Sequence, residues 1–134
     1  MYKRFDPIDG LTANIIEAVM SSEDMPKDEG LLFKLRLAVE EAVENIVNYA
    51  YSDGAGYLEA ETFVKDGVLS IVLQDAGVPF NPLEKEDPDI TLSAEDRPIG
   101  GLGIFLCKQL MDSVEYEFSN GCNKLTIRKR IAQP

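Results

Sequence analysis

The sequence predicts an α+β fold, a two-layer sandwich in which helices cover one face of a mostly antiparallel mixed sheet. Helical and strand-like patterns follow one another in the order two helices, a hairpin, a long loop, a helix and a second hairpin. The 134 residues suit one domain, and no internal repeat or Ser/Gly linker divides them. We therefore expect a single domain over residues 1–134.

The first part of the chain contains two segments with apolar residues at helical spacing. Leu11–Met20 is the first. The second begins after Asp28, whose carboxylate suits an N-cap, and Glu29 is favourable in its first turn. Its apolar stripe consists of Leu32, Leu35, Val39, Val43, Ile46 and Ala50. This helix should end near Ser52, where the sequence SDGAG contains helix breakers.

A hairpin and a long loop follow. Tyr57–Val64 alternates between apolar and polar residues, and Val68–Leu73 is a run of apolar residues. Lys65-Asp66-Gly67 between them is a hairpin turn signal. Pro79–Pro98 holds four of the seven prolines and eight charges, so it is predicted to be a loop. A loop of that length inside a compact domain is usually functional or disordered.

The last part of the chain should form one helix and one hairpin. Helical spacing resumes at Leu102 and stops near Asp112. Val114–Ser119 and Leu125–Ile131 are predicted strands, joined through Asn120-Gly121.

Composition excludes several classes of function. The chain has 13 Lys and Arg, 24 Asp and Glu and no histidine, so its formal net charge is −11. Without histidine, Ser-His-Asp and Cys-His catalysis, histidine metal sites and a phosphohistidine relay are excluded. The acidic balance argues against direct binding of nucleic acid or of an anionic membrane. Cys107 and Cys122 lie outside any CxxC spacing and are expected to be free thiols. No secretory signal and no membrane-spanning stretch is found, so we expect a cytoplasmic protein.

One face of the long helix carries the first candidate site residues. Glu41 and Asn45 are four residues apart and Asn48 follows three later, so all three share a face. On the helix alone, a solvated polar face is the simpler interpretation. It does not explain two asparagines, because asparagine is a mediocre helix former.

Two further motifs are suited to a ligand. Asp75 follows a buried strand and could accept a hydrogen bond from an exocyclic amine, and Gly77 would let a flat ring approach the backbone. An ordinary strand exit explains this pair equally well. Gly100-Gly101-Leu102-Gly103 opens the last helix, where free N–H groups and the helix dipole suit phosphates. It follows no strand and lacks the GK[ST] ending of a P-loop.

Together, three segments of the chain resemble the GHKL ATPase superfamily. They are VEEAVENIVNYAY (Val39–Tyr51), QDAGVPFNP (Gln74–Pro82) and RPIGGLGIFL (Arg97–Leu106). This superfamily includes the ATP-binding domains of gyrase, sensor histidine kinases and MutL-type proteins, and it has the Bergerat-type ATP-binding fold. Within it, the chain is most similar to the small anti-sigma-factor serine/threonine kinases. The resemblance covers roughly residues 31–131.

The resemblance implies a role for each motif residue. Glu41 would be the general base, and Asn45 would bind the Mg²⁺ ion that is bound to the triphosphate of ATP. Asp75 would read the adenine, with Gly77 beside the base. The backbone amides of Gly101, Leu102 and Gly103 would face the phosphates.

The remaining assignments are less direct. Asn48, one turn beyond Asn45, would help to hold the polyphosphate, and Pro79–Pro98 would be the ATP lid. Arg97 could reach a phosphate or pair within the lid.

The sequence departs from the family pattern at two places. Glu40 precedes Glu41, and the spacing E-x-x-x-N favours Glu41 as the base. Family members often bring a Thr toward the adenine-reading Asp after a Gly. Here Gly121-Cys122-Asn123 intervenes and Thr126 comes late, so that position stays open.

The parts that are missing select the subfamily. A sensor histidine kinase needs a phosphoacceptor histidine, and gyrase and MutL-type proteins need a further domain. We therefore expect an ATP- and Mg²⁺-dependent anti-sigma protein that sequesters a sigma factor and phosphorylates a serine of an anti-anti-sigma (STAS) partner. The alternatives are an ATP-binding partner-switching module without kinase activity and an interaction domain that binds no nucleotide. The resemblance also implies a possible homodimer.

Overall fold

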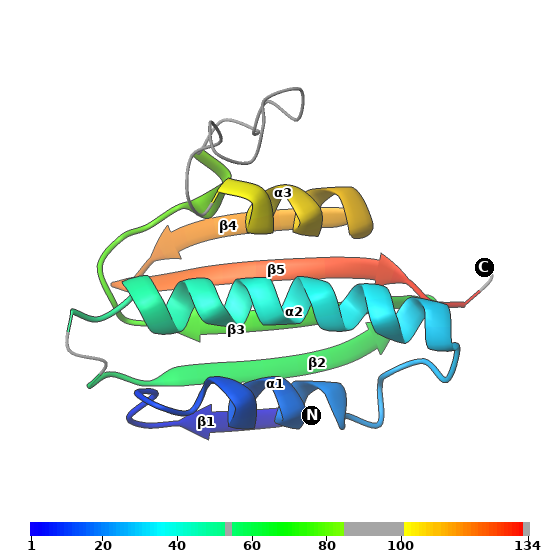
Figure 1. Ribbon diagram of the computed structural model, residues 1–134, viewed down its shortest axis with the longest axis horizontal. Coiled ribbons are helices and arrows are strands. Elements are labelled where there is room, and N and C mark those ends of the chain that lie inside the picture. Colours follow the sequence, from blue (N-terminus) through cyan, green and yellow to red (C-terminus); the bar gives the residue numbers. More distant parts are fainter. Residues whose placement is uncertain (53–54, 85–100, 133–134) are drawn as a thin grey trace.

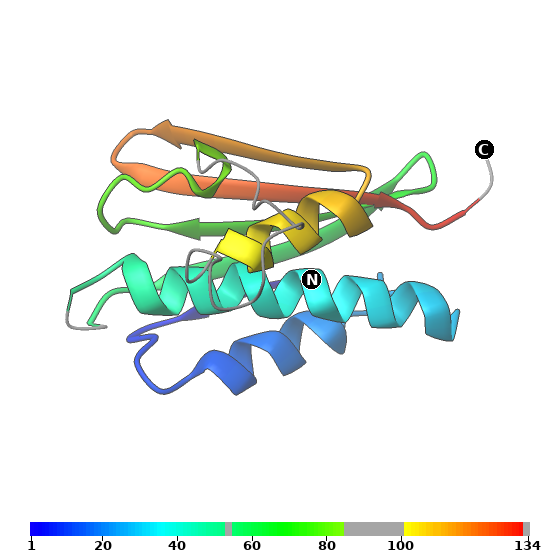
Figure 2. The same cartoon turned by 45° about the horizontal axis from the view of Figure 1, so that its top comes forward.

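The computed structural model describes residues 1–52, 55–84 and 101–132. Figure 1 shows helices lying along a twisted sheet, and Figure 2 shows that they form a single layer on one face of it. This arrangement confirms the predicted α+β sandwich. Among the described residues, no helix has the length and apolar character needed to cross a membrane.

Among the described residues, five strands form the sheet in the order β1-β2-β3-β5-β4, and every pairing between them is antiparallel. They are β1 (Tyr2–Phe5), β2 (Leu58–Lys65), β3 (Val68–Asp75), β4 (Ser113–Ser119) and β5 (Cys122–Arg130). Both predicted hairpins are present. β1 was not predicted, because it has four residues of which three are exposed. β5 begins at Cys122, three residues before the predicted start.

In the described part of the chain, three α-helices cover the sheet and a short 3-10 helix follows β3. They are α1 (Thr12–Met20), α2 (Glu29–Tyr49), α3 (Gly101–Leu110) and η1 (Pro82–Glu84). Asp28 is the N-cap of α2 as predicted, because its Oδ1 accepts a hydrogen bond from Leu31 N at 2.9 Å. α2 lies between the other two helices (Figure 1) and packs against both.

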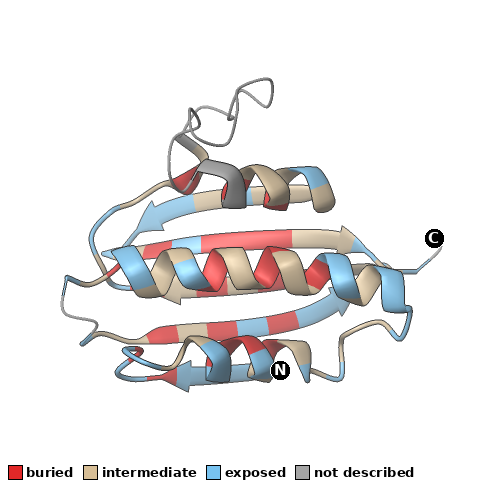
Figure 3. Ribbon diagram, viewed as in Figure 1, coloured by how far each residue is buried: buried red, intermediate tan, exposed pale blue. Residues whose placement is uncertain are grey.

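The core lies between α2 and the central strands, where the buried residues concentrate (Figure 3). Leu35, Val39 and Val43 of the predicted stripe are fully buried, whereas Leu32 and Ile46 are half-buried. Side chains from β3 and β5 complete the core opposite them, among them Leu69, Ile71, Leu73 and Ile127. Burial of this apolar surface is the main force that holds the helical layer on the sheet.

The C-terminal ends of α2 and β3 meet the start of β5 at one end of the molecule, on the left in Figure 1. In the β3–β5 ladder Asp75 is paired with Asn123. Val78 N donates to the carbonyl oxygen of Ala50, the C-cap of α2, at 2.9 Å. The segment after β3 is therefore fastened to the end of α2, and the candidate residues of both elements come close together.

Candidate functional site

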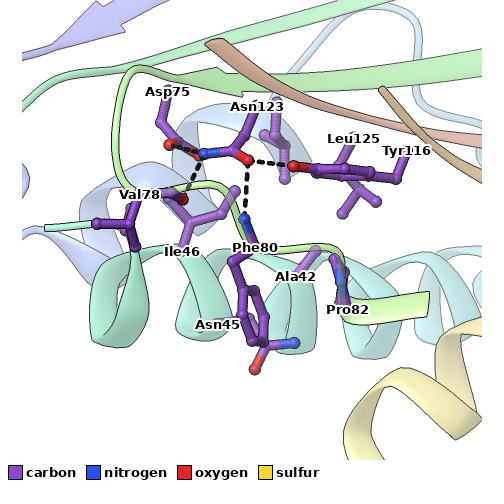
Figure 4. A pocket seen from close by; sticks show the side chains of 12 residues that line it. Ala42, Asn45, Ile46, Asp75, Val78, Phe80, Pro82, Tyr116, Asn123 and Leu125 are labelled. Atoms are coloured by element: carbon purple, nitrogen blue, oxygen red, sulfur yellow. Dashed lines mark hydrogen bonds between the residues drawn. The ribbon is translucent and has the colours of Figure 1, made fainter. Parts of the chain in front are cut away.

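A pocket opens between α2 and this end of the sheet (Figure 4). Most of its walls are apolar, and Asp75, Asn123 and Asn45 are its polar members besides Tyr116. The lining residues are Ala42, Asn45, Ile46, Ala50, Leu73, Asp75, Val78, Phe80, Pro82, Tyr116, Asn123 and Leu125. The cavity volume is about 30 Å³, which holds about two water molecules. A purine ring would therefore enter only if an aromatic wall residue such as Phe80 or Tyr116 moved.

Asp75 lines this pocket and uses only one of its carboxylate oxygens for hydrogen bonds within the described residues. Its side chain is buried, with 2% of the residue exposed. Oδ1 accepts hydrogen bonds from Gly77 N at 2.8 Å and from Asn123 Nδ2 at 2.9 Å. Oδ2 has no partner within the described part of the chain. Burial raises the pKa of Asp75, and the two hydrogen bonds oppose that rise. The site thus offers a buried acceptor to a ligand that carries an N–H group.

Asn123 is the site residue that the sequence left unassigned. Nδ2 donates to Asp75 and also to the carbonyl oxygen of Val78 at 2.9 Å. Oδ1 accepts from Phe80 N at 3.2 Å and from the Tyr116 hydroxyl. Every second residue of β5 points to the helices, and Asn123 is polar where this alternation calls for an apolar residue. That break in the pattern is the signal that could have found it.

Thr126, the other residue considered as the neighbour of Asp75, is not paired with Asp75 in the sheet. It is paired with Val72 and Glu115 in the sheet. By the alternation of β5 it therefore points to the sheet face opposite the helices.

Gly77 has a role in packing within the described structure. A Cβ at this position would lie 2.1 Å from the carbonyl oxygen of Ala50. The glycine therefore permits the close approach of the strand exit to the end of α2. Its N–H group also orients the carboxylate of Asp75.

The three candidates on α2 are only partly brought together. Asn45 is half-buried and lines the pocket. Glu41 is half-buried outside the lining residues, and burial, followed by the charges of Glu44 and Glu40, raises its pKa. Asn48 is exposed and is not among the lining residues. The structure therefore places Asn45 at the pocket, Glu41 one turn from it, and Asn48 outside it.

Glu41 and Glu40 face different neighbours. Arg36 bridges Glu40 at 3.5 Å and Glu17 of α1 at 2.7 Å, so Glu40 lies on the α1 side of α2. Burial raises the pKa of Cys107 in α3 to about 12, and the charge of Glu41 adds to that rise. Glu41 therefore lies on the α3 side, the side on which the glycine motif begins its helix.

Gly101, Leu102 and Gly103 form the first turn of α3, one residue earlier than predicted. α3 packs against α2, and its first turn lies toward the pocket end of the molecule (Figures 1 and 2). Free amides at such a turn suit an anion. Most of the predicted lid, with Arg97 and Gly100, lies outside the described residues. Within those residues no group of three or more acidic or Cys side chains could hold a metal ion.

The comparisons with known proteins agree with this fold. A family model described as the histidine kinase-like ATPase domain matches residues 11–129. The chain belongs to this family. It is 30% identical over 105 residues to the serine/threonine-protein kinase BtrW of Bordetella bronchiseptica, covering 76% of this chain and 72% of that protein.

Two more similarities place the chain within the family. It is 33% identical over 95 residues to the serine-protein kinase RsbW of Bacillus thuringiensis, covering 68% of this chain but only 59% of that protein. The solved RsbU and RsbW domains from Mycobacterium tuberculosis superpose with a TM-score of 0.62 at 16% identity, covering all of this chain and 33% of that one. The family, the fold and the similarity to serine kinases thus indicate a kinase-type ATPase.

Proposed function

We propose that this protein is an ATP-dependent anti-sigma regulator of the cytoplasm, which sequesters a sigma factor and phosphorylates a serine of an anti-anti-sigma (STAS) partner. The observation that carries the proposal is the buried Asp75, which lines a largely apolar pocket and whose Oδ2 has no partner within the described residues. This arrangement fits the exocyclic amine of adenine, with the ring between apolar walls. The names of BtrW and RsbW support the kinase assignment.

Different residues of this chain would bind the adenine base, bind the phosphates and activate the serine of the partner protein. Asp75 would accept the hydrogen bond from adenine, and the amides at the start of α3 would donate to the phosphates. Glu41, on the α3 side of α2, would accept the proton of the incoming serine hydroxyl. Its raised pKa makes it a better proton acceptor than an ordinary carboxylate. The serine oxygen then bonds to the terminal phosphorus, and the bond to ADP breaks.

The oxygen ligands present fit a magnesium ion that is bound together with the nucleotide. Mg²⁺ prefers oxygen ligands and is often held by few protein groups together with substrate phosphates. Asn45, which is one of the lining residues of the pocket, would supply the protein oxygen. The ion would neutralise charge on the phosphates, which a chain of net charge −11 otherwise repels.

The direct test is phosphoryl transfer from labelled ATP to a purified STAS partner. Glu41→Gln should abolish transfer while Mg-ATP binding is retained. Glu40→Gln is the matched control, because Glu40 is the neighbouring acid on the α1 side, and it should transfer normally. Binding of ATP without transfer to any STAS protein would favour the partner-switching module without kinase activity. Full transfer by Glu41→Gln would contradict the assigned base.

A further inference from the structure

Tyr51 lies two residues beyond the end of α2 and holds two backbone segments together. Its hydroxyl donates to the carbonyl oxygen of Tyr57 at 2.7 Å and accepts from Ala76 N at 2.8 Å. The ring is half-buried against the core. Burial raises the pKa of Tyr51, and the nearby charge of Asp75 contributes to the rise. The phenol therefore stays protonated and can donate and accept at once.

The hydroxyl occupies the place where the β2–β3 ladder would otherwise continue. The two strands are joined by the two-residue turn Asp66-Gly67, so the residues that flank the turn form a hydrogen-bonded pair. Such pairs recur at every second position of an antiparallel ladder. Counting every second pair from Lys65 and Val68 at the turn, Tyr57 and Ala76 would form a hydrogen-bonded pair. The ladder instead ends one residue earlier, at Leu58 and Asp75. The phenol lies between the two groups that would have bonded to each other.

Two glycines make room for this arrangement. A Cβ at Gly56 would lie 2.1 Å from the ring of Tyr51, so only glycine lets the ring reach its place. Beyond Ala76, Gly77 packs on the carbonyl of Ala50 and Val78 N donates to the same oxygen. The chain therefore leaves the sheet at Ala76 and turns onto the end of α2.

We propose that Tyr51 is a positioning residue that keeps β2 and β3 apart after Asp75 and thereby sets the selectivity of the pocket for a 6-aminopurine. This inference rests on the proposed function. The pocket has one wall from α2, which includes Asn45 and Ile46, and another from the strand exit, which includes Asp75 and Val78. Their separation depends on where the chain leaves the sheet. If Ala76 bonded directly to Tyr57, the backbone that holds Oδ1 of Asp75 would move with it.

The test is Tyr51→Phe, which removes the hydroxyl and keeps the ring against Gly56. We expect the affinity for Mg-ATP to fall about tenfold, as for the loss of one or two hydrogen bonds. Affinity for inosine triphosphate, which carries an oxo group at position 6, should fall less, so the preference for ATP shrinks. A loss of overall stability alone would weaken both nucleotides equally. Tyr2→Phe is the matched control, because Tyr2 lies on the edge strand β1 with its ring exposed and donates its hydroxyl hydrogen bond to Glu59 of β2.

A second variant approaches the same contact from the other side. Gly56→Ala should displace the ring and shrink the ATP preference without a change to Tyr51 itself. Backbone NMR supplies a readout that needs no nucleotide: the amide signals of Ala76 and Gly77 should shift in Tyr51→Phe and stay in place in Tyr2→Phe. Failure of the wild type to bind ATP would overturn the proposed function alone. The amide signals would still test whether the Tyr51 hydroxyl holds Ala76 away from Tyr57. Unchanged amide signals, or an unchanged ATP preference in a folded Tyr51→Phe protein, would overturn the inference.

Discussion

Replacement of Asn123 by Asp tests the hydrogen-bond network of the pocket with almost no change of shape. The substitution exchanges Nδ2, which donates to Asp75 Oδ1 at 2.9 Å, for a carboxylate oxygen. Two ionised carboxylates at that distance repel by about 6 kcal/mol at an effective dielectric constant of 20. Keeping one carboxyl protonated at pH 7 costs about 4 kcal/mol when its ordinary pKa is near 4. Protonation costs less, so the folded variant should hold one extra proton between Asp75 and residue 123.

The extra proton makes the loss of stability depend on pH. The unfolded chain does not hold this proton above about pH 4, so unfolding releases it, and a rise in pH favours unfolding by about 1.4 kcal/mol per unit. The variant should therefore be about 4 kcal/mol less stable than the wild type at pH 7 and only about 1.4 kcal/mol less stable at pH 5.

Urea denaturation at the two pH values measures this difference. Asn14→Asp, on an exposed position of α1, is the control with the same change of charge, and it should lose little stability at either pH. A deficit for Asn123→Asp that is the same at pH 5 and pH 7, or no deficit at all, would refute the assigned network.

Three further results are expected. Gly77→Ala should lower the free energy of unfolding by about 2 kcal/mol in urea, because its Cβ would lie 2.1 Å from the carbonyl oxygen of Ala50. Gly30→Ala, in the exposed first turn of α2, should not lower it to this extent. Equal effects of the two substitutions would argue against the close approach of Gly77 to Ala50. Glu41→Gln should raise the melting temperature at neutral pH, since a carboxyl whose pKa is raised by burial destabilises the fold when ionised, and a lower melting temperature would contradict the burial of Glu41. Removal of magnesium with EDTA should lower the affinity for ATP but not for adenosine in calorimetry, and an unchanged ATP affinity would count against Asn45 as a metal ligand.

Local signals account for the parts of the fold that the sequence predicted. Asp66-Gly67 and Asn120-Gly121 all have positive φ in the structure, the conformation that makes such pairs typical of hairpin turns. The N-cap at Asp28 and the spacing of the apolar stripe fix α2 in the same way. β1 gave no such signal, because it is short and two of its four residues are charged, and only its pairing with β2 makes it a strand.

The candidate site divides along the same line. Asp75 was found because it ends an apolar strand, which is a local feature. Asn123 was not, because its role depends on the β3–β5 register, a pairing between strands 48 residues apart in the chain. The true neighbour of Gly77 and the choice of Glu41 over Glu40 also depend on which element packs on which side of α2. Non-local packing of this kind cannot be derived from spacing alone.

We propose above all that Oδ2 of Asp75 accepts a hydrogen bond from the exocyclic amine of adenine. Calorimetry of the wild type and Asp75→Asn with Mg-ATP and Mg-inosine triphosphate tests it most directly. The amide keeps Oδ1 as an acceptor for Gly77 and Asn123 but places a donor where Oδ2 stood. The wild type should prefer ATP by about ten- to a hundredfold, in line with 1–3 kcal/mol for an unpaired buried group, and Asp75→Asn should lose or reverse this preference. Equal binding of both nucleotides by the wild type, or an unchanged preference in Asp75→Asn, would contradict the account.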